Sequence, residues 1–173
     1  MSDQKLRITF PVLTAPGLKK IDFLDNLQLI INVDFKEMVV VSPFVDAYII
    51  RNIIRRTLNR DRKITVVTRY GKAEERQKKS IDEAISEIQK FSKIDSKLRE
   101  KVRWFIQEKV HAKFVVVDWK TVLFGSQNLT KYGGLSGNYE LGAMLEDEEL
   151  ASKLKPFVDN IINNSKLLYP KGK

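Results

Sequence analysis

Residues 109–128, KVHAKFVVVDWKTVLFGSQN, decide how this chain folds. The apolar run from Ala112 to Val117 is short and β-branched, which predicts a buried strand ending at the polar corner 118–120. A second strand is expected from Thr121 to Gly125. Pairing of the two strands would return the chain to the edge of the sheet at which the first strand begins.

Polar side chains stand at both ends of this hairpin. Because side chains alternate along a strand, His111 and Lys113 are expected to point to one side and Asp118 to the other. Ser126 and Asn128 follow the second strand to the same edge as His111. An imidazole, an ammonium, a hydroxyl and an amide gathered at one spot suit a phosphate group. Asp118 is instead expected to hold the corner between the strands.

Length and composition favour one domain with its own core. A chain of 173 residues that is 43% hydrophobic can bury roughly 70% of its unfolded surface. We expect an arm or strand over residues 1–20 and one domain over residues 21–173. The chain has no cysteine and one histidine, which excludes disulfides, thiolate metal sites and any zinc site that needs two histidines from the same chain. No cofactor or metal is expected.

The first residues lack the apolar stretch of a secretory signal, and no apolar run approaches the ~18 residues of a membrane span. A cytoplasmic location is therefore expected. The formal charge of +9 and the isoelectric point near 9.6 favour a polyanionic partner, with nucleic acid ahead of an acidic membrane surface.

Basic residues are concentrated between positions 51 and 79, a stretch that contains eleven Lys or Arg and only three acidic residues. This stretch supplies the candidate contacts to nucleic acid. The alternative is that these charges form the solvated helix faces of a basic protein. The candidates are Arg51, Arg55, Arg56, Arg69 and Lys72.

Helical and strand patterns alternate early in the chain, whereas strands follow one another later. A strand or arm over 5–10 is expected to end at Pro11. Asp46 should cap a helix with an apolar face from Ile49 to Leu58. Pro156 should kink or divide the last helix, and the tail from Pro170 should be frayed. Further helices are predicted at 21–33, 73–91 and 147–164, strands at 38–41, 63–68, 102–106 and 138–145, and a glycine-rich loop at 131–137. This order predicts an α/β fold, a mixed β-sheet flanked by helices on both faces.

The full pattern is His-x-Lys-x4-Asp, then six residues, then Gly-Ser-x-Asn. It resembles the HKD signature of the phospholipase D superfamily, and the resemblance extends from about Ile21 to Phe157. Glu140 falls where small bacterial nucleases of that family carry a glutamate. His-x-Lys alone would be uninformative, but five positions at matching spacing are specific. The resemblance implies a phospholipase D-like α-β-α sandwich, with Asp118 and Gly125 as structural members of the motif.

The resemblance also implies a mechanism. One histidine attacks the phosphorus of a phosphodiester, and a second histidine protonates the leaving oxygen and then activates water. Lysines and asparagines, here Lys113 and Asn128, neutralise and orient the phosphate oxygens. Glu140 would accept the Nδ1 proton of a histidine, and Ser126 would support phosphate binding or the loop. Most members carry two motifs, so a chain with His111 alone requires a second copy about a two-fold axis.

The sequence therefore predicts a metal-independent phosphodiesterase, an endonuclease acting on DNA or RNA with DNA favoured, working as a homodimer. A phospholipase or phosphatidyl transferase is the first alternative; such enzymes usually need an apolar channel, and no exposed apolar stretch is obvious in this sequence. A non-catalytic nucleic-acid-binding module of a larger system is the second. Glu140 could also be a merely solvated side chain. Trp104 and Trp119 are expected in the core rather than stacked on bases.

Overall fold

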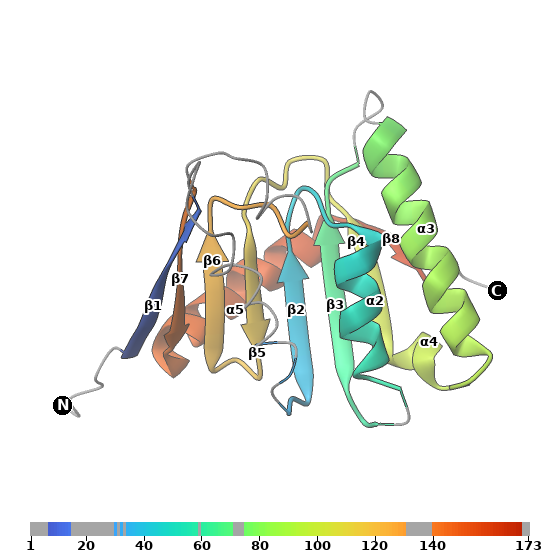
Figure 1. Ribbon diagram of the computed structural model, residues 1–173, viewed down its shortest axis with the longest axis horizontal. Coiled ribbons are helices and arrows are strands. Elements are labelled where there is room, and N and C mark those ends of the chain that lie inside the picture. The colour runs from blue at the N-terminus through green and yellow to red at the C-terminus, as the bar shows by residue number, and fades with distance from the viewer. Residues whose placement is uncertain are drawn as a thin grey trace.

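One mixed β-sheet carries the rest of the structure. The computed structural model describes residues 7–14, 30, 32, 34–58, 60–70, 75–130 and 140–170. Its strands are β1 (Arg7–Thr14), β2 (Glu37–Val41), β3 (Lys63–Thr68), β4 (Val102–Ile106), β5 (Phe114–Val117), β6 (Thr121–Gly125), β7 (Glu140–Glu146) and β8 (Lys166–Tyr169). Within this part of the chain the eight strands are ordered β1-β7-β6-β5-β2-β3-β4-β8 (Figure 1). The pairs β2-β3 and β3-β4 are parallel, and the other pairs are antiparallel.

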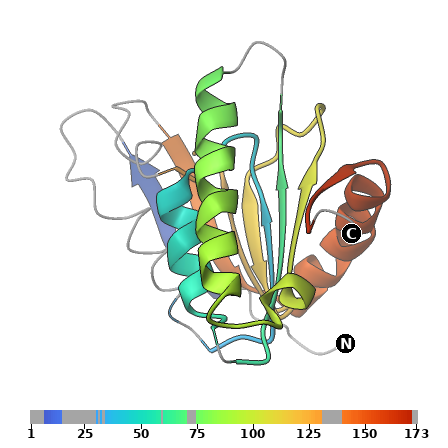
Figure 2. The same ribbon diagram turned by 90° about the vertical axis from the view of Figure 1, so that its right-hand side faces the viewer.

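Helices cover both faces of this sheet. The helices are α2 (Ala47–Arg55), α3 (Glu75–Ser92), α4 (Leu98–Lys101) and α5 (Glu148–Asn163). Figure 2 shows α2 and α3 on one face and α5 on the other. Alternate residues of β2 serve the two layers, since Met38 and Val40 belong to the core under α2 and α3, and Val39 and Val41 belong to the core under α5. The predicted α/β sandwich is confirmed.

Several elements match their sequence patterns closely. β3, β4 and β6 have the predicted bounds. The Asp46 side chain accepts a hydrogen bond of 2.9 Å from the Ile49 amide, which caps α2 as expected. Trp104 is fully buried and donates from Nε1 to Thr68 Oγ1 at 2.9 Å, so it belongs to the core.

Neither Pro11 nor Pro156 ends the element in which it lies. β1 continues through Pro11 to Thr14, because β1 ends the strand order and an edge strand has one side without ladder bonds. α5 runs unbroken across Pro156. Because proline has no N–H, the carbonyl of Ser152, four residues earlier, lacks its helical hydrogen-bond donor. Ser152 and Pro156 are both exposed, so water can donate to that carbonyl instead.

A strand that the sequence did not predict follows α5, and the tail predicted to be frayed lies outside the described residues except for Pro170. After α5 the chain forms β8, which pairs antiparallel with β4. Tyr169 is buried there, with its hydroxyl 3.1 Å from Ser92 Oγ. The short helix α4 was also not predicted. Most of the predicted helix 21–33 and all of the loop 131–137 lie outside the described residues. In the part of the chain that is described, no helix is long and apolar enough to span a bilayer.

Strand direction brings several chain segments to one edge of the sheet. β2, β3 and β4 end at this edge, which we call the C-terminal edge. β5 begins there because Phe114 pairs with Val41, and β6 ends there because Phe124 pairs with Phe114. β7 begins there, opposite the end of β6. Open α/β sheets bind ligands at the carboxyl ends of their parallel strands.

Candidate active site

His111 and Lys113 lie together at the C-terminal edge. β5 begins at Phe114 rather than at Ala112, so both residues precede the strand. The Gly125 amide donates to the Lys113 carbonyl at 3.1 Å, which keeps this segment attached to β6. Lys113 Nζ lies 3.4 Å from His111 Nδ1 and donates to the His111 carbonyl at 2.8 Å. The imidazole itself is exposed.

The Lys113 ammonium is only partly hydrated. Burial lowers the pKa of Lys113 below its usual 10.5, and the nearby Glu140 carboxylate partly opposes this pKa shift. A partly desolvated ammonium gains more from an anionic ligand than an exposed one does, because less water must be displaced. Lys113 therefore suits the binding of a phosphate.

Ser126 connects the end of β6 to the start of β7. Its hydroxyl donates to Glu140 Oε2 and accepts from the Leu141 amide at 3.0 Å. Its own amide donates to the Leu141 carbonyl at 2.9 Å. Ser126 thus fixes the position of the Glu140 carboxylate. Within the described chain Glu140 makes no hydrogen bond to His111, whose Nδ1 faces Lys113 instead.

Asn128 lies on the loop that follows Ser126. The next amide along, that of Leu129, donates to the buried Ser42 Oγ at 3.2 Å, which attaches the loop to the segment after β2. The Asn128 Oδ1 atom is buried and has no hydrogen-bond partner among the described residues. A buried amide oxygen without a partner is costly and is a frequent feature of functional sites.

Gln127 is a site residue that the sequence did not single out. It occupies the variable position of Gly-Ser-x-Asn and is only 1% exposed. A Cβ on Gly125 would lie 2.7 Å from Gln127 Oε1, and a Cβ on Gly142 would lie 2.6 Å from the Phe124 carbonyl. The two glycines therefore let β6 and β7 approach closely with the Gln127 amide over them. Sequence periodicity gives no signal for this packing.

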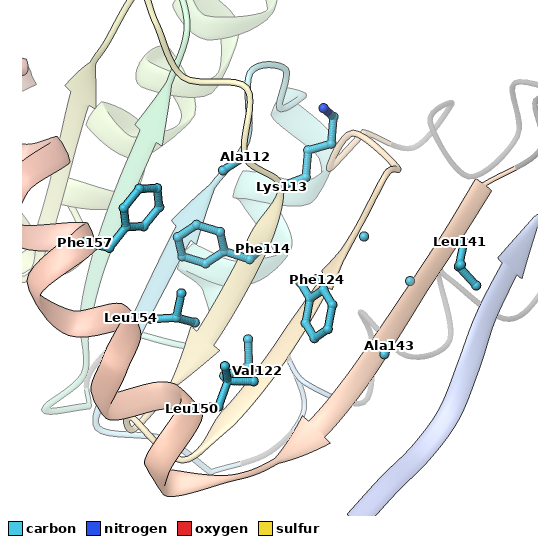
Figure 3. Close-up of a pocket in the computed structure, with 12 residues that line it drawn as sticks. Ala112, Lys113, Phe114, Val122, Phe124, Leu141, Ala143, Leu150, Leu154 and Phe157 are labelled. Carbon is cyan, nitrogen blue, oxygen red and sulfur yellow. The ribbon is translucent and has the colours of Figure 1, made fainter.

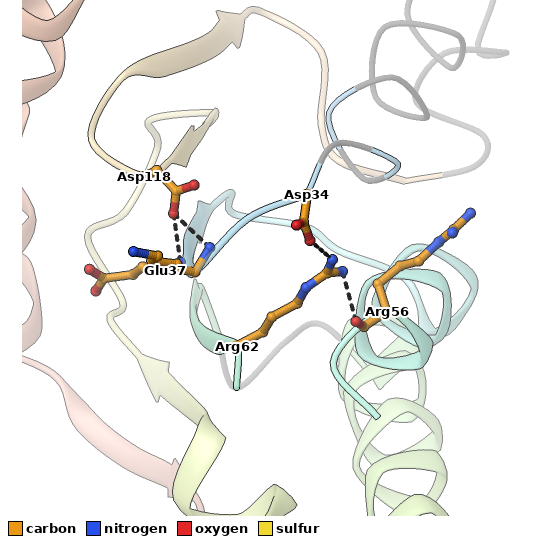
Figure 4. A network of polar contacts seen from close by, with 6 residues as sticks. Asp34, Glu37, Arg56, Arg62 and Asp118 are labelled. Atoms are coloured by element: carbon orange, nitrogen blue, oxygen red, sulfur yellow. Dashed lines mark hydrogen bonds and ion pairs between the residues drawn. The ribbon is translucent and has the colours of Figure 1, made fainter. Parts of the chain in front are cut away.

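Asp118 lies at the opposite edge of the sheet, at the end of β5. Its Oδ1 accepts hydrogen bonds of 2.8 Å from the amides of both Lys36 and Glu37, where β2 begins (Figure 4). Asp118 lies five residue steps along extended chain from Lys113, which corresponds to roughly 17 Å. Trp119 is half-buried beside it and donates to Glu37 Oε2 at 3.0 Å. Asp118 holds the β5-β6 corner against β2.

Four of the five candidate nucleic-acid contacts are described, and they lie at different positions along α2 and after β3. Arg51 pairs with Glu87 at 3.2 Å, and Arg55 lies over the Phe91 ring. Arg56 is near the edge at which β3 begins, where its carbonyl accepts from Arg62 (Figure 4). Arg69 follows β3 and so lies at the C-terminal edge with His111. Lys72 lies outside the described residues.

An apolar groove of about 610 Å³ lies between α5 and the strands β6 and β7. Figure 3 shows Leu154 and Phe157 of α5 on one side and Phe124 and Leu141 on the other. Phe124, Leu141 and Phe157 are all substantially exposed, with Leu141 at 63%. Lys113 stands at the end of the groove and its side chain leads away from the apolar residues. The sequence contains no obvious exposed apolar stretch, so this groove was not apparent from the sequence.

A second cavity, of about 660 Å³, adjoins the first on the side of His111. Ala112 and Phe157 line both cavities. The remaining lining of the second cavity is mainly polar: Gln107, Lys109, His111, Asn160 and Asn164, together with Val110 and Ile161. Among the described residues, no group of three or more His, Cys, Asp or Glu side chains could hold a metal ion.

One family model matches most of the chain, and several solved structures share its fold. The model for the phospholipase D-like domain of cardiolipin synthase matches residues 29–162. Nuc from Salmonella typhimurium, a phospholipase D family member, is 15% identical with a TM-score of 0.65, and the match covers 92% of this chain and 99% of Nuc. NucT from Helicobacter pylori is 18% identical with a TM-score of 0.67, at the same coverage.

Other similar structures differ in what they are described to do. Phosphatidylserine synthase from Haemophilus influenzae is 15% identical with a TM-score of 0.69, and the match covers 91% of this chain but 39% of that enzyme. TrmBL2, an archaeal chromatin protein described with a novel mode of DNA binding, is 15% identical with a TM-score of 0.58, covering 90% of this chain and 53% of TrmBL2. Among curated proteins no sequence matches. At these identities the structures establish the fold alone.

Proposed function

The chain belongs to the phospholipase D superfamily, and from this premise we propose that it is a phosphodiesterase that cleaves nucleic acid without a metal ion. The observation that carries the proposal is the meeting of His111, Lys113, Ser126 and Glu140 at one edge of the sheet. The net charge of +9 favours a polyanionic substrate. DNA is the favoured substrate, with RNA as the alternative.

The reaction would proceed in two displacements. In the first, His111 Nε2 attacks the phosphorus, an N–P bond forms, and the P–O bond to the leaving group breaks. A second imidazolium donates its proton to the leaving oxygen. In the second, that imidazole removes a proton from water, the water oxygen attacks phosphorus, and the N–P bond breaks to release His111. Lys113 and Asn128 would hold the non-bridging oxygens throughout.

The position of Lys113 suggests how the nucleophile is prepared. For Nε2 to attack, Nδ1 must carry the proton, whereas an ammonium beside Nδ1 requires Nδ1 to accept one. We infer that Lys113 turns from His111 to the phosphate when substrate binds. Nδ1 can then donate to a carboxylate, and Glu140 is the candidate because its charge raises the pKa of Lys113.

The second imidazole must come from a second copy, because this chain has one histidine. An isologous dimer would bring the C-terminal edges of two chains together about a two-fold axis. Each copy would supply one imidazole, one ammonium and one amide. The active enzyme would therefore be a homodimer with one shared site.

The direct test is incubation of the protein with supercoiled plasmid DNA in EDTA, beside the His111→Ala variant. We expect nicking by the native protein and none by the variant, with equal thermal stability because His111 is exposed. Binding to DNA should survive in the variant and weaken steeply with salt in both, since phosphate contacts release counterions. Nicking by His111→Ala would overturn the mechanism.

The apolar groove supports a second candidate, a phospholipase or phosphatidyl transferase. Its position beside Lys113 would allow a phosphate at the site to carry a hydrocarbon chain along α5 (Figure 3). The direction of the Lys113 side chain, away from the groove, counts against this candidate. Hydrolysis of phosphatidylcholine vesicles with plasmid left intact would favour it. Binding of DNA with neither activity would instead favour a recognition module.

A further inference from the structure

The cavity beside His111 has a polar lining that the phosphate chemistry leaves unexplained. Its volume of about 660 Å³ lies in the range of small-molecule sites, roughly 300–1,000 Å³. His111 lines it, so a group bonded to a phosphate at His111 can enter it. The cavity therefore lies beside the atoms that would react, and it could hold a part of the substrate that does not react.

Three amide side chains line this cavity. Gln107 Nε2 donates to the Asn164 carbonyl, and Asn164 Nδ2 donates to the Asn160 carbonyl at 2.8 Å and to Asn160 Oδ1 at 3.1 Å. These bonds fix the amides to one another and to the end of α5. Amide side chains present a donor and an acceptor side by side, which is the arrangement found on the edges of nucleobases.

An aromatic ring forms the boundary between this cavity and the apolar groove. Phe157 is 46% exposed, and its ring packs on Phe114 at a centroid distance of 6.3 Å with a tilt of 41°. Because Phe114 occupies only part of the ring surface, the remainder is available to a planar ligand. Aromatic side chains bind bases by stacking with little dependence on base identity.

The charge of the lining distinguishes between possible ligands. Lys109 is exposed at the cavity, and none of the described residues that line it carries a carboxylate. A choline or ethanolamine group would meet a positive charge with no anionic partner. A neutral group with hydrogen-bonding edges and a flat face, attached to a phosphate, fits the lining better.

We propose that this cavity binds an unstacked nucleobase of the nucleotide next to the scissile phosphate. The base stacks on Phe157 and its edge meets the amides of Asn160 and Gln107. A base held in this way has left its helical stack, so the preferred substrate is single-stranded or locally unpaired nucleic acid. This inference rests on the proposed function, in that the phosphate lies at His111.

The test measures binding rather than cleavage. The dissociation constants of thymidine 3′- and 5′-monophosphate are compared by NMR titration with those of the matching 2-deoxyribose phosphates and of glycerol 3-phosphate. We expect at least one nucleotide to bind on the order of tenfold more tightly than its base-free counterpart. Phe157→Leu and Asn160→Ala should each reduce this preference and leave the affinity for sugar phosphate unchanged. Asn163→Ala, an exposed amide on the same helix outside the cavity, should retain the preference.

Equal affinity for nucleotides and base-free phosphates would overturn the inference, as would a preference that survives in both variants. These outcomes are separable from a failure of the proposed function. A protein that nicks plasmid without any base preference loses the inference alone. A protein that binds the base through Phe157 and Asn160 but cleaves no nucleic acid loses the proposed activity alone.

Discussion

Asp118→Ala should destabilise the protein without altering the chemistry at His111. The substitution removes two hydrogen bonds of 2.8 Å, from the amides of Lys36 and Glu37 to the Asp118 carboxylate. A hydrogen bond to a charged group contributes about 1.5–3 kcal/mol, and solvent exposure favours the lower end. The backbone at Asp118 has φ of 51°, a left-handed conformation that costs alanine about 1 kcal/mol. The free energy of unfolding should therefore fall by about 3–4 kcal/mol.

Urea unfolding gives this loss, and kcat normalised to the folded fraction tests the chemistry. Asp118→Asn is the matched control, because asparagine retains the Oδ1 acceptor and tolerates positive φ. The free energy of unfolding of Asp118→Asn should fall by about 1 kcal/mol, the cost of removing the charge alone. The reasoning is refuted if alanine costs no more than asparagine. It is also refuted if kcat per folded molecule falls in either variant, since Asp118 would then take part in the reaction.

Two further predictions concern the C-terminal edge. Lys113→Met should lower kcat by about 100-fold or more, the usual effect of losing one charge-stabilising donor, whereas Lys97→Met should not. Because burial lowers the pKa of Lys113 in the folded state, the unfolded chain binds its proton more tightly, so Lys113→Met should melt at the same or a higher temperature. As the pH increases from the lowered pKa towards 10.5, the free energy of unfolding of the native protein should rise relative to that of the variant. A lower melting temperature for Lys113→Met than for the native protein would contradict this reasoning. Gly142→Ala places a Cβ 2.6 Å from the Phe124 carbonyl and should cost about 1–3 kcal/mol in urea unfolding, while Glu146→Ala on the same strand should change little.

The order of the central elements could be predicted from the sequence because its local signals agree. β3, β4 and β6 are apolar runs with clear limits, and Asp46 is a strong helix cap. The hairpin of β5 and β6 is a short-range structure, so its spacing alone brings His111 and Ser126 to one edge. The sequence also predicted that Asp118 lies outside the site, because side chains alternate between the two faces of a strand. In the structure the distance along β5 separates Asp118 from His111 as well.

Features that depend on distant parts of the chain could not be predicted. Periodicity identifies the apolar face of α5 but does not say how far along the sheet α5 reaches. Phe157 therefore resembles an ordinary core residue in the sequence, yet it lines a groove because the faces of β6 and β7 that carry Phe124 and Leu141 remain open. β8 likewise depends on distant residues, since the Tyr169 hydroxyl lies 3.1 Å from Ser92 Oγ, 77 positions earlier in the chain.

The central claim is that His111 is half of a catalytic site completed by a second chain. The most direct measurement uses a heterodimer of native and His111→Ala chains, carrying different affinity tags and purified through both. A shared site then holds one imidazole, so nicking of plasmid in EDTA should fall to the level of the His111→Ala homodimer. Half of the native activity in the heterodimer, or full activity from a native monomer, would contradict the claim.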